Sequence, residues 1–174
     1  LIKDIVKGRL HNGVWDLKSY QALFNNIINE KAIGESTVLY LYYYNEAIKN
    51  IKKYLGDDVK IIIMLRNPVD RAFSAYTHVS RSLKESLSFE KALEIEANRL
   101  GNDETLTPMV MYKDMGLYHD MVNAYVENFK NVHVIMYEDF QQNTKEVVNQ
   151  ALAFLGILKA GDLDTHSKHN VGGK

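Results

Sequence analysis

The sequence predicts an α/β fold built around a parallel sheet, and three observations support this class. Two short apolar runs rich in β-branched residues, at 60–65 and 132–137, indicate strands buried on both faces, as in parallel sheets. Apolar residues recur at helical spacing before, between and after these runs. Strands that alternate with helices of this length indicate α/β architecture with a parallel sheet.

The expected elements follow one another along the chain with recognisable ends. Gly56 and Gly156 stand where a glycine ends a helix, and Thr144 is a good N-cap for the last helix. Two or three strands make a thin sheet for so many helices, which indicates that a strand is missing from the N-terminal side. We expect helices over about 17–28, 44–55, 68–83, 118–129 and 144–155, one more starting near Ser88 with Leu100 facing inward, a third short strand at 32–36, and a loop at 101–115.

Composition indicates a single globular domain over residues 1–174. Hydrophobic residues make up 46% of the chain and charged residues 25%, and the net charge of -1 favours neither nucleic acid nor a membrane surface as a partner. No apolar run approaches the roughly 18–20 residues needed to span a bilayer. The absence of cysteine excludes disulfides, thiolate metal sites and cysteine nucleophiles, and it fits a reducing compartment such as the cytoplasm.

The segment 65–76 carries the clearest chemical signal. Arg66 follows the first strand, Asn67 is a good N-cap residue, and Pro68 suits the first position of a helix. Ser74 lies two turns into that helix. An arginine fork and a hydroxyl donor near a helix start favour a phosphate monoester. The same residues also fit a structural strand-to-helix corner, and the pattern alone leaves both interpretations open.

The run 65–78, LRNPVDRAFSAYTH, resembles the 3′-phosphate-binding motif of sulfotransferases that use 3′-phosphoadenylyl sulfate (PAPS). In that motif an arginine at the strand end and a serine eight residues later hold the 3′-phosphate, and Arg66 and Ser74 match them. The order of further landmarks strengthens the resemblance, which covers about residues 16–157. These landmarks are a GE-S/T segment at 33–41, an SFEEAL-like start at 88–93, a G-x-Y at 116–118, an E-D at 138–139 after a strand, and an FLG at 154–156.

The resemblance implies a three-layer P-loop-NTPase-like sandwich of the sulfotransferase type. It implies transfer of a sulfonate from PAPS, as co-substrate and without a metal, to a hydroxyl or amine of a carbohydrate or small molecule. Arg66 and Ser74 would anchor the donor. Lys174 would join them, because the basic, glycine-rich tail 168–174 resembles the family loop that closes over the 3′-phosphate; a frayed terminus is the equal alternative.

The sequence departs from the family in one important place. Residues 1–33 hold no glycine-rich, lysine-bearing loop after a buried strand, the element that binds the 5′-phosphosulfate in the family. We therefore expect an N-terminally incomplete domain that is inactive alone, and the general base is not assigned. Two alternatives remain: a nucleotide or sugar kinase of P-loop fold, and a non-catalytic domain that binds a nucleotide or a protein.

Other polar residues favour structural interpretations. Glu35 is expected to act as a cap or a buried hydrogen-bond acceptor rather than in catalysis. The tyrosines at 40 and 42–44 indicate a helix start packed on the sheet more than a base-stacking surface. Arg71 is expected to pair with a carboxylate. The six histidines show no ligand spacing, so no metal site is predicted.

Overall fold

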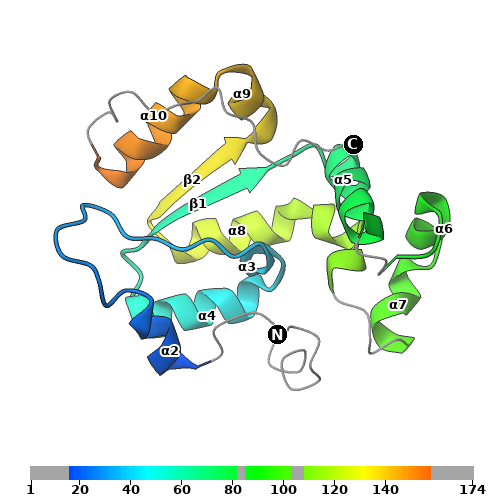
Figure 1. Ribbon diagram of the computed structural model, residues 1–174, viewed down its shortest axis with the longest axis horizontal. Helices are drawn as coiled ribbons and strands as arrows, with labels where there is room; N and C mark the ends of the chain where they lie inside the picture. The colour runs from blue at the N-terminus through cyan, green and yellow to red at the C-terminus, as the bar shows by residue number, and fades with distance from the viewer. Residues whose placement is uncertain (1–15, 82–84, 103–107, 158–174) are drawn as a thin grey trace. The chain divides into compact units, whose positions relative to one another are not determined.

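The computed structural model describes residues 16–81, 85–102 and 108–157 and forms two compact units. The first unit takes in the described residues of Leu1–Glu30 and Pro68–Tyr118, and the second those of Lys31–Asn67 and His119–Lys174. The first unit holds α2 (Leu17–Ala22), α5 (Pro68–Arg81), α6 (Phe89–Glu94), α7 (Glu96–Asn102), η1 (Pro108–Val110) and η2 (Asp114–Gly116). The second holds α3 (Leu39–Tyr42), α4 (Tyr44–Leu55), β1 (Lys60–Leu65), α8 (Tyr118–Asn128), β2 (Asn131–Met136), α9 (Tyr137–Gln142) and α10 (Thr144–Leu155) (Figure 1). Tyr118, the first residue of α8, is counted with the first unit.

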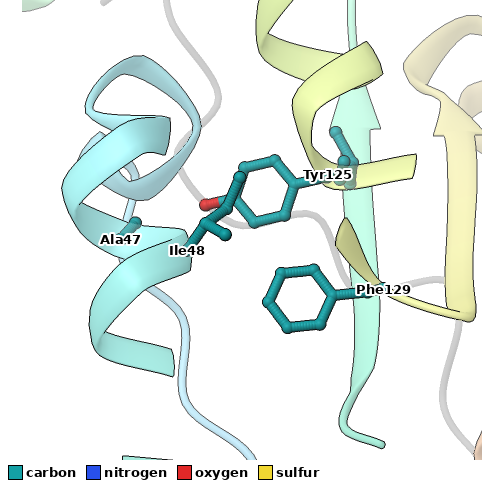
Figure 2. Close-up of a cluster of buried hydrophobic side chains, with 5 residues drawn as sticks. Ala47, Ile48, Tyr125 and Phe129 are labelled. Carbon is teal, nitrogen blue, oxygen red and sulfur yellow. The ribbon is translucent and has the colours of Figure 1, made fainter. Parts of the chain in front are cut away.

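The sheet of the second unit consists of β1 and β2 in parallel, from Lys60 opposite Asn131 to Leu65 opposite Met136. Helices α4 and α8 cover one face, as Figure 1 shows, and Figure 2 shows the cluster that joins them. On the other face α10 lies against β2, where the His133 and Phe154 rings stack 5.2 Å apart. This confirms the predicted parallel pair with helices on both sides. The cluster of buried side chains is Ala47, Ile48, Ile63, Tyr125 and Phe129.

The tyrosine-rich helix start packs into this core, as the sequence predicts. Tyr40 and Tyr44 lie against the buried cluster. The Tyr125 hydroxyl donates a hydrogen bond to the main-chain carbonyl of Tyr40 at 2.9 Å. Burial raises the pKa of Tyr125 to about 12, so this hydroxyl keeps its proton and remains a donor.

The expectation that both strands are buried on both faces is wrong for each strand, since Val134 and Met136 in β2 are 39% and 42% exposed and β1 is exposed on one face. Ile63 is 6% exposed, whereas its neighbours Ile62 and Met64 are 40% and 47% exposed. In β2 the face toward α10 is better covered, since Ile135 is 7% exposed. The difference arises because α10 packs on β2, so the corresponding face of β1 lacks cover among the residues that the structure describes.

The first unit has a separate core around α5. Its buried residues come from α5, α6 and the segment around η1, and the rings of Tyr76, Phe89 and Tyr112 pack among them. A buried polar network lies beside this core. The Glu85 carboxylate accepts two hydrogen bonds from the Arg99 guanidinium, at 2.6 and 2.8 Å, and one from the Tyr112 hydroxyl at 3.0 Å.

Several expected elements differ from the structure. No strand forms at 32–36, where the described chain is irregular. The first helix ends at Ala22, where the amides of Phe24 and Asn25 bond three residues back in turns instead of four residues back in a helix. Further along, the Glu30 carboxylate accepts the Ile28 and Asn29 amides at 2.7 and 3.0 Å, which gives these amides non-helical partners. The expected loop at 101–115 contains η1 and η2, and residues 103–107 lie outside the described residues.

Three helix boundaries also require correction. The helix that starts at Ser88 breaks at Ile95, and Glu96 begins α7 with its buried carboxylate accepting the Lys113 and Asp114 amides at 2.8 Å each. Tyr137 starts α9 instead of ending the strand. The N-cap of α10 is Asn143 rather than Thr144, because the Thr144 hydroxyl donates back to the Phe140 carbonyl at 2.8 Å.

Candidate functional site

The turn after β1 carries the first predicted site residue. Arg66 directly follows the strand and is half-buried. Its guanidinium lies over the Tyr137 ring, with 5.1 Å from Cζ to the ring centroid. A guanidinium stacked on an aromatic face loses little of its hydrogen-bonding capacity, because its donors lie in the plane of the group. The arginine is therefore held at the carboxyl end of the sheet with donors directed along that plane.

A carboxylate supports the same turn. Glu138 Oε1 accepts a hydrogen bond from the Asn67 main-chain N–H at 2.8 Å. This bond, more than any other contact, lowers the pKa of Glu138, and the nearby Arg66 charge lowers it further. The second oxygen, Oε2, is shielded from solvent and accepts no hydrogen bond within the described chain. Glu138 is thus an ionised group at an edge where the sequence predicts an anion site.

The second predicted site residue lies on α5 in the first unit. Helix α5 begins at Pro68, and Ser74 is exposed two turns later. The start of this helix approaches Gly116 closely, since a Cβ at that position would lie 3.2 Å from the Pro68 Cβ. The glycine of the G-x-Y landmark therefore permits contact with the helix that carries Ser74.

Arg71 on the same helix has a structural role, but its partner differs from the expected one. The guanidinium donates to the main-chain carbonyl of Tyr112, where the sequence predicts a carboxylate. Burial lowers the pKa of Arg71, while the Tyr118 and Glu96 groups oppose that effect. Arg71 thus ties α5 to the segment between η1 and η2 within the first unit.

The structure places the remaining candidates as follows. Arg66 belongs to the second unit and Ser74 to the first, and each is described within its own unit. Lys174 lies outside the described residues. So do residues 1–15 of the segment 1–33, in which the sequence shows no phosphosulfate-binding loop. Glu35 accepts a hydrogen bond from the Thr37 hydroxyl at 3.2 Å, but it is exposed, whereas a buried acceptor was one of the two roles expected.

Sequence reasoning used Glu138 only as a landmark and did not predict its contact with the turn after β1. A signal was present, because Glu138 follows the second buried strand, and parallel strands end at the same sheet edge. Among the described residues, no group of three histidine, aspartate or glutamate side chains could hold a metal ion. In the same part of the chain, no helix is long and apolar enough to cross a membrane.

A parallel sheet with helices on both faces, and an arginine at its carboxyl end, define the class of α/β proteins that bind ligands at the strand ends. The family model described as "Sulfotransferase domain" matches residues 47–171, so the chain belongs to the sulfotransferase family. This assignment confirms the resemblance stated from the sequence and sets the kinase alternative aside.

A solved structure supports the same family. The chain is similar to the crystal structure of a sulfotransferase from Alicyclobacillus acidocaldarius, with 37% sequence identity and a TM-score of 0.82 over 94% of this chain. This confirms the predicted P-loop-NTPase-like α/β fold of the sulfotransferase type. The chain spans 66% of the length of that structure. No curated protein matches the chain.

Proposed function

We propose that the protein is a sulfotransferase that uses PAPS, and that Arg66 and Ser74 bind the 3′-phosphate of the donor. The single observation that carries this proposal is the half-buried Arg66 guanidinium at the carboxyl end of β1, stacked on Tyr137 and inside the matched family segment. The exposed Ser74 hydroxyl on the following helix supports it.

The side chains of Arg66 and Ser74 have donors that suit a phosphate monoester. Arginine keeps its charge at all physiological pH values and presents paired donors that match phosphate oxygens. A serine hydroxyl adds a neutral donor. Lys174 would add a second cation, as the family resemblance of the tail implies.

In this proposal Arg66 and Ser74 bind and orient the donor and take no part in bond breaking. When bound, PAPS supplies the sulfonate, which moves to the oxygen or nitrogen of a hydroxyl or amine acceptor as the donor's S–O bond breaks and the acceptor loses its proton. The contribution of the anchoring residues is positional, because fixing the nucleotide end holds the reactive end in place. The acceptor class, a carbohydrate or small molecule, follows from the family, and the cysteine-free sequence is compatible with a cytoplasmic site of action.

Calorimetric titration with two nucleotides tests the binding site. We expect 3′-phosphoadenosine 5′-phosphate (PAP) to bind at least tenfold more tightly than 5′-AMP, which lacks the 3′-phosphate. Arg66→Ala removes a charge-assisted contact worth about 1.5–3 kcal/mol and should abolish most of this preference. Arg81→Ala, which removes an exposed arginine at the end of α5, is the matched control and should preserve it.

The same titration examines the other predicted ligands of the phosphate. Ser74→Ala and Lys174→Ala should each reduce the preference for PAP by a smaller factor than Arg66→Ala. Equal affinities of the wild-type chain for PAP and 5′-AMP would contradict the proposed site. A PAPS turnover assay addresses the separate prediction that this chain is inactive alone, and binding without turnover is the result that this prediction requires.

A further inference from the structure

The two strands of the sheet end side by side, and the residues that follow each strand contact those that follow the other. Leu65 lies opposite Met136 at the last position of the register. The next residues are Arg66 and Asn67 after β1, and Tyr137 and Glu138 after β2. Tyr137 places its ring against the Arg66 guanidinium, and Glu138 accepts the Asn67 amide. The beginning of α9 therefore supports both residues of the turn.

The charge of Glu138 makes its position unexpected. A carboxylate beside Arg66 repels a bound anion and partly neutralises the cation that should attract it. Its Oε2 atom is also shielded from water without a hydrogen-bond partner in the described chain, although an unsatisfied charged oxygen is unfavourable. A group that opposes anion binding by charge is useful at this edge only if its hydrogen bond fixes the geometry of the turn.

We propose that Glu138 is a positioning residue, which fixes the turn carrying Arg66 through its hydrogen bond to the Asn67 amide and thereby sets the affinity for the 3′-phosphate. The inference rests on the proposed function of Arg66. Two effects of Glu138 have opposite signs: its hydrogen bond strengthens phosphate binding by fixing Arg66, while its negative charge weakens it. Substitutions can separate them, because glutamine retains an acceptor oxygen and loses the charge, whereas alanine loses both.

Two readouts on three variants test the proposal. Hydrogen exchange of the Asn67 amide, followed by NMR, reports on the turn without any ligand. Calorimetric titration with PAP reports on the site. The variants are Glu138→Ala, Glu138→Gln, and Asp139→Asn as the matched control, since Asp139 is the adjacent exposed carboxylate on the same helix. Melting temperature and the amide spectrum verify that each variant is folded.

We expect Glu138→Ala to accelerate exchange of the Asn67 amide and to weaken PAP binding, each by about tenfold, because one hydrogen bond to a charged acceptor is lost. Glu138→Gln should keep Asn67 protected and bind PAP as tightly as wild type or more tightly. Asp139→Asn should leave both readouts unchanged. Opposite effects of alanine and glutamine on affinity would not follow from a merely structural role, which would weaken binding in both variants.

Three outcomes overturn the proposal: unchanged Asn67 exchange in Glu138→Ala, wild-type PAP affinity in that variant despite faster exchange, or tenfold weaker binding in Glu138→Gln. If Glu138→Ala does not fold, Glu138→Asp takes its place, because it keeps the charge but withdraws the carboxylate from the Asn67 amide, and the same losses are expected. If wild type does not bind PAP, the proposed function fails, while the exchange of Asn67 still shows whether Glu138 fixes the turn.

Discussion

Replacing Arg99 by methionine would leave a buried carboxylate without its cation in the first unit. Glu85 receives four hydrogen bonds: two from Arg99, one from the Tyr112 hydroxyl, and one from the Leu87 amide at 3.1 Å. The side chains of Arg99 and Glu85 are only 6% and 1% exposed. Removing one partner of a buried ion pair typically costs about 3–5 kcal/mol, because the remaining charge stays buried and uncompensated.

Urea and thermal unfolding of the Arg99→Met variant measure this cost. For a protein of this size each kcal/mol lowers the melting temperature by about 2–4 °C, so we expect a decrease of about 6–20 °C. The matched control is Lys91→Met, which removes an ion pair with Glu94 whose side chains are 52% and 67% exposed. Its effect should be at most about 0.5 kcal/mol. Similar losses in both variants would refute the reasoning.

The pH dependence of stability provides a second test of the same pair. Burial alone would raise the pKa of Glu85, but the hydrogen bonds from Arg99, Leu87 and Tyr112 outweigh it and lower the pKa. The wild-type contribution is therefore present above the pH range in which a free glutamate titrates, about pH 4, and is lost as pH falls through the lowered pKa. In Arg99→Met the effect of burial should dominate and raise the pKa, so this variant should become relatively more stable toward acid. Parallel pH profiles for the two proteins would contradict the assignment.

Two further predictions concern single contacts. Arg71→Met should lower the melting temperature by about 3–12 °C, since it loses one charge-assisted hydrogen bond to the Tyr112 carbonyl, while PAP affinity measured by calorimetry stays unchanged. Lost affinity without lost stability would reverse this role. Gly156→Ala should lower the free energy of unfolding in urea by about 1–2 kcal/mol, because Gly156 ends α10 with a φ of +81°. Gly34→Ala is the control and should be nearly neutral, since no atom lies within 4 Å of the added Cβ. Equal effects of the two substitutions would refute the conformational argument.

The sequence predicted the elements whose apolar pattern is long and regular. Helices α4 and α8 and the two strands lie within about two residues of the expected ranges, because each is bounded by a clear break and contributes to one core. The strand expected at 32–36 was wrong, since five residues with a central glycine carry too little pattern to distinguish a strand from an irregular segment. Helix α9 was missed because it spans only six residues directly after a strand.

The candidate site was predictable where chemistry and position coincide in one short segment. Arg66 and Ser74 belong to a single strand-turn-helix pattern, which local sequence reasoning can detect. Glu138 could not be assigned in this way, because its contact with Asn67 joins residues 71 positions apart and depends on the register of the strands. The partner of Arg71 likewise depends on tertiary contacts that local sequence does not reveal. The sequence predicted a carboxylate, and the structure has the Tyr112 main-chain carbonyl.

The order of the two units along the chain has a consequence for biosynthesis. Residues Pro68–Tyr118 of the first unit are inserted between the two halves of the second, so β1 is translated well before its partner β2. At about 5–20 residues per second, the ribosome needs roughly 4–14 s to add the 71 residues that separate paired positions. During that interval the strand Lys60–Leu65 is part of the nascent chain without β2, the strand that it pairs with in the structure. Slower translation of the inserted residues would therefore delay the pairing of the two strands.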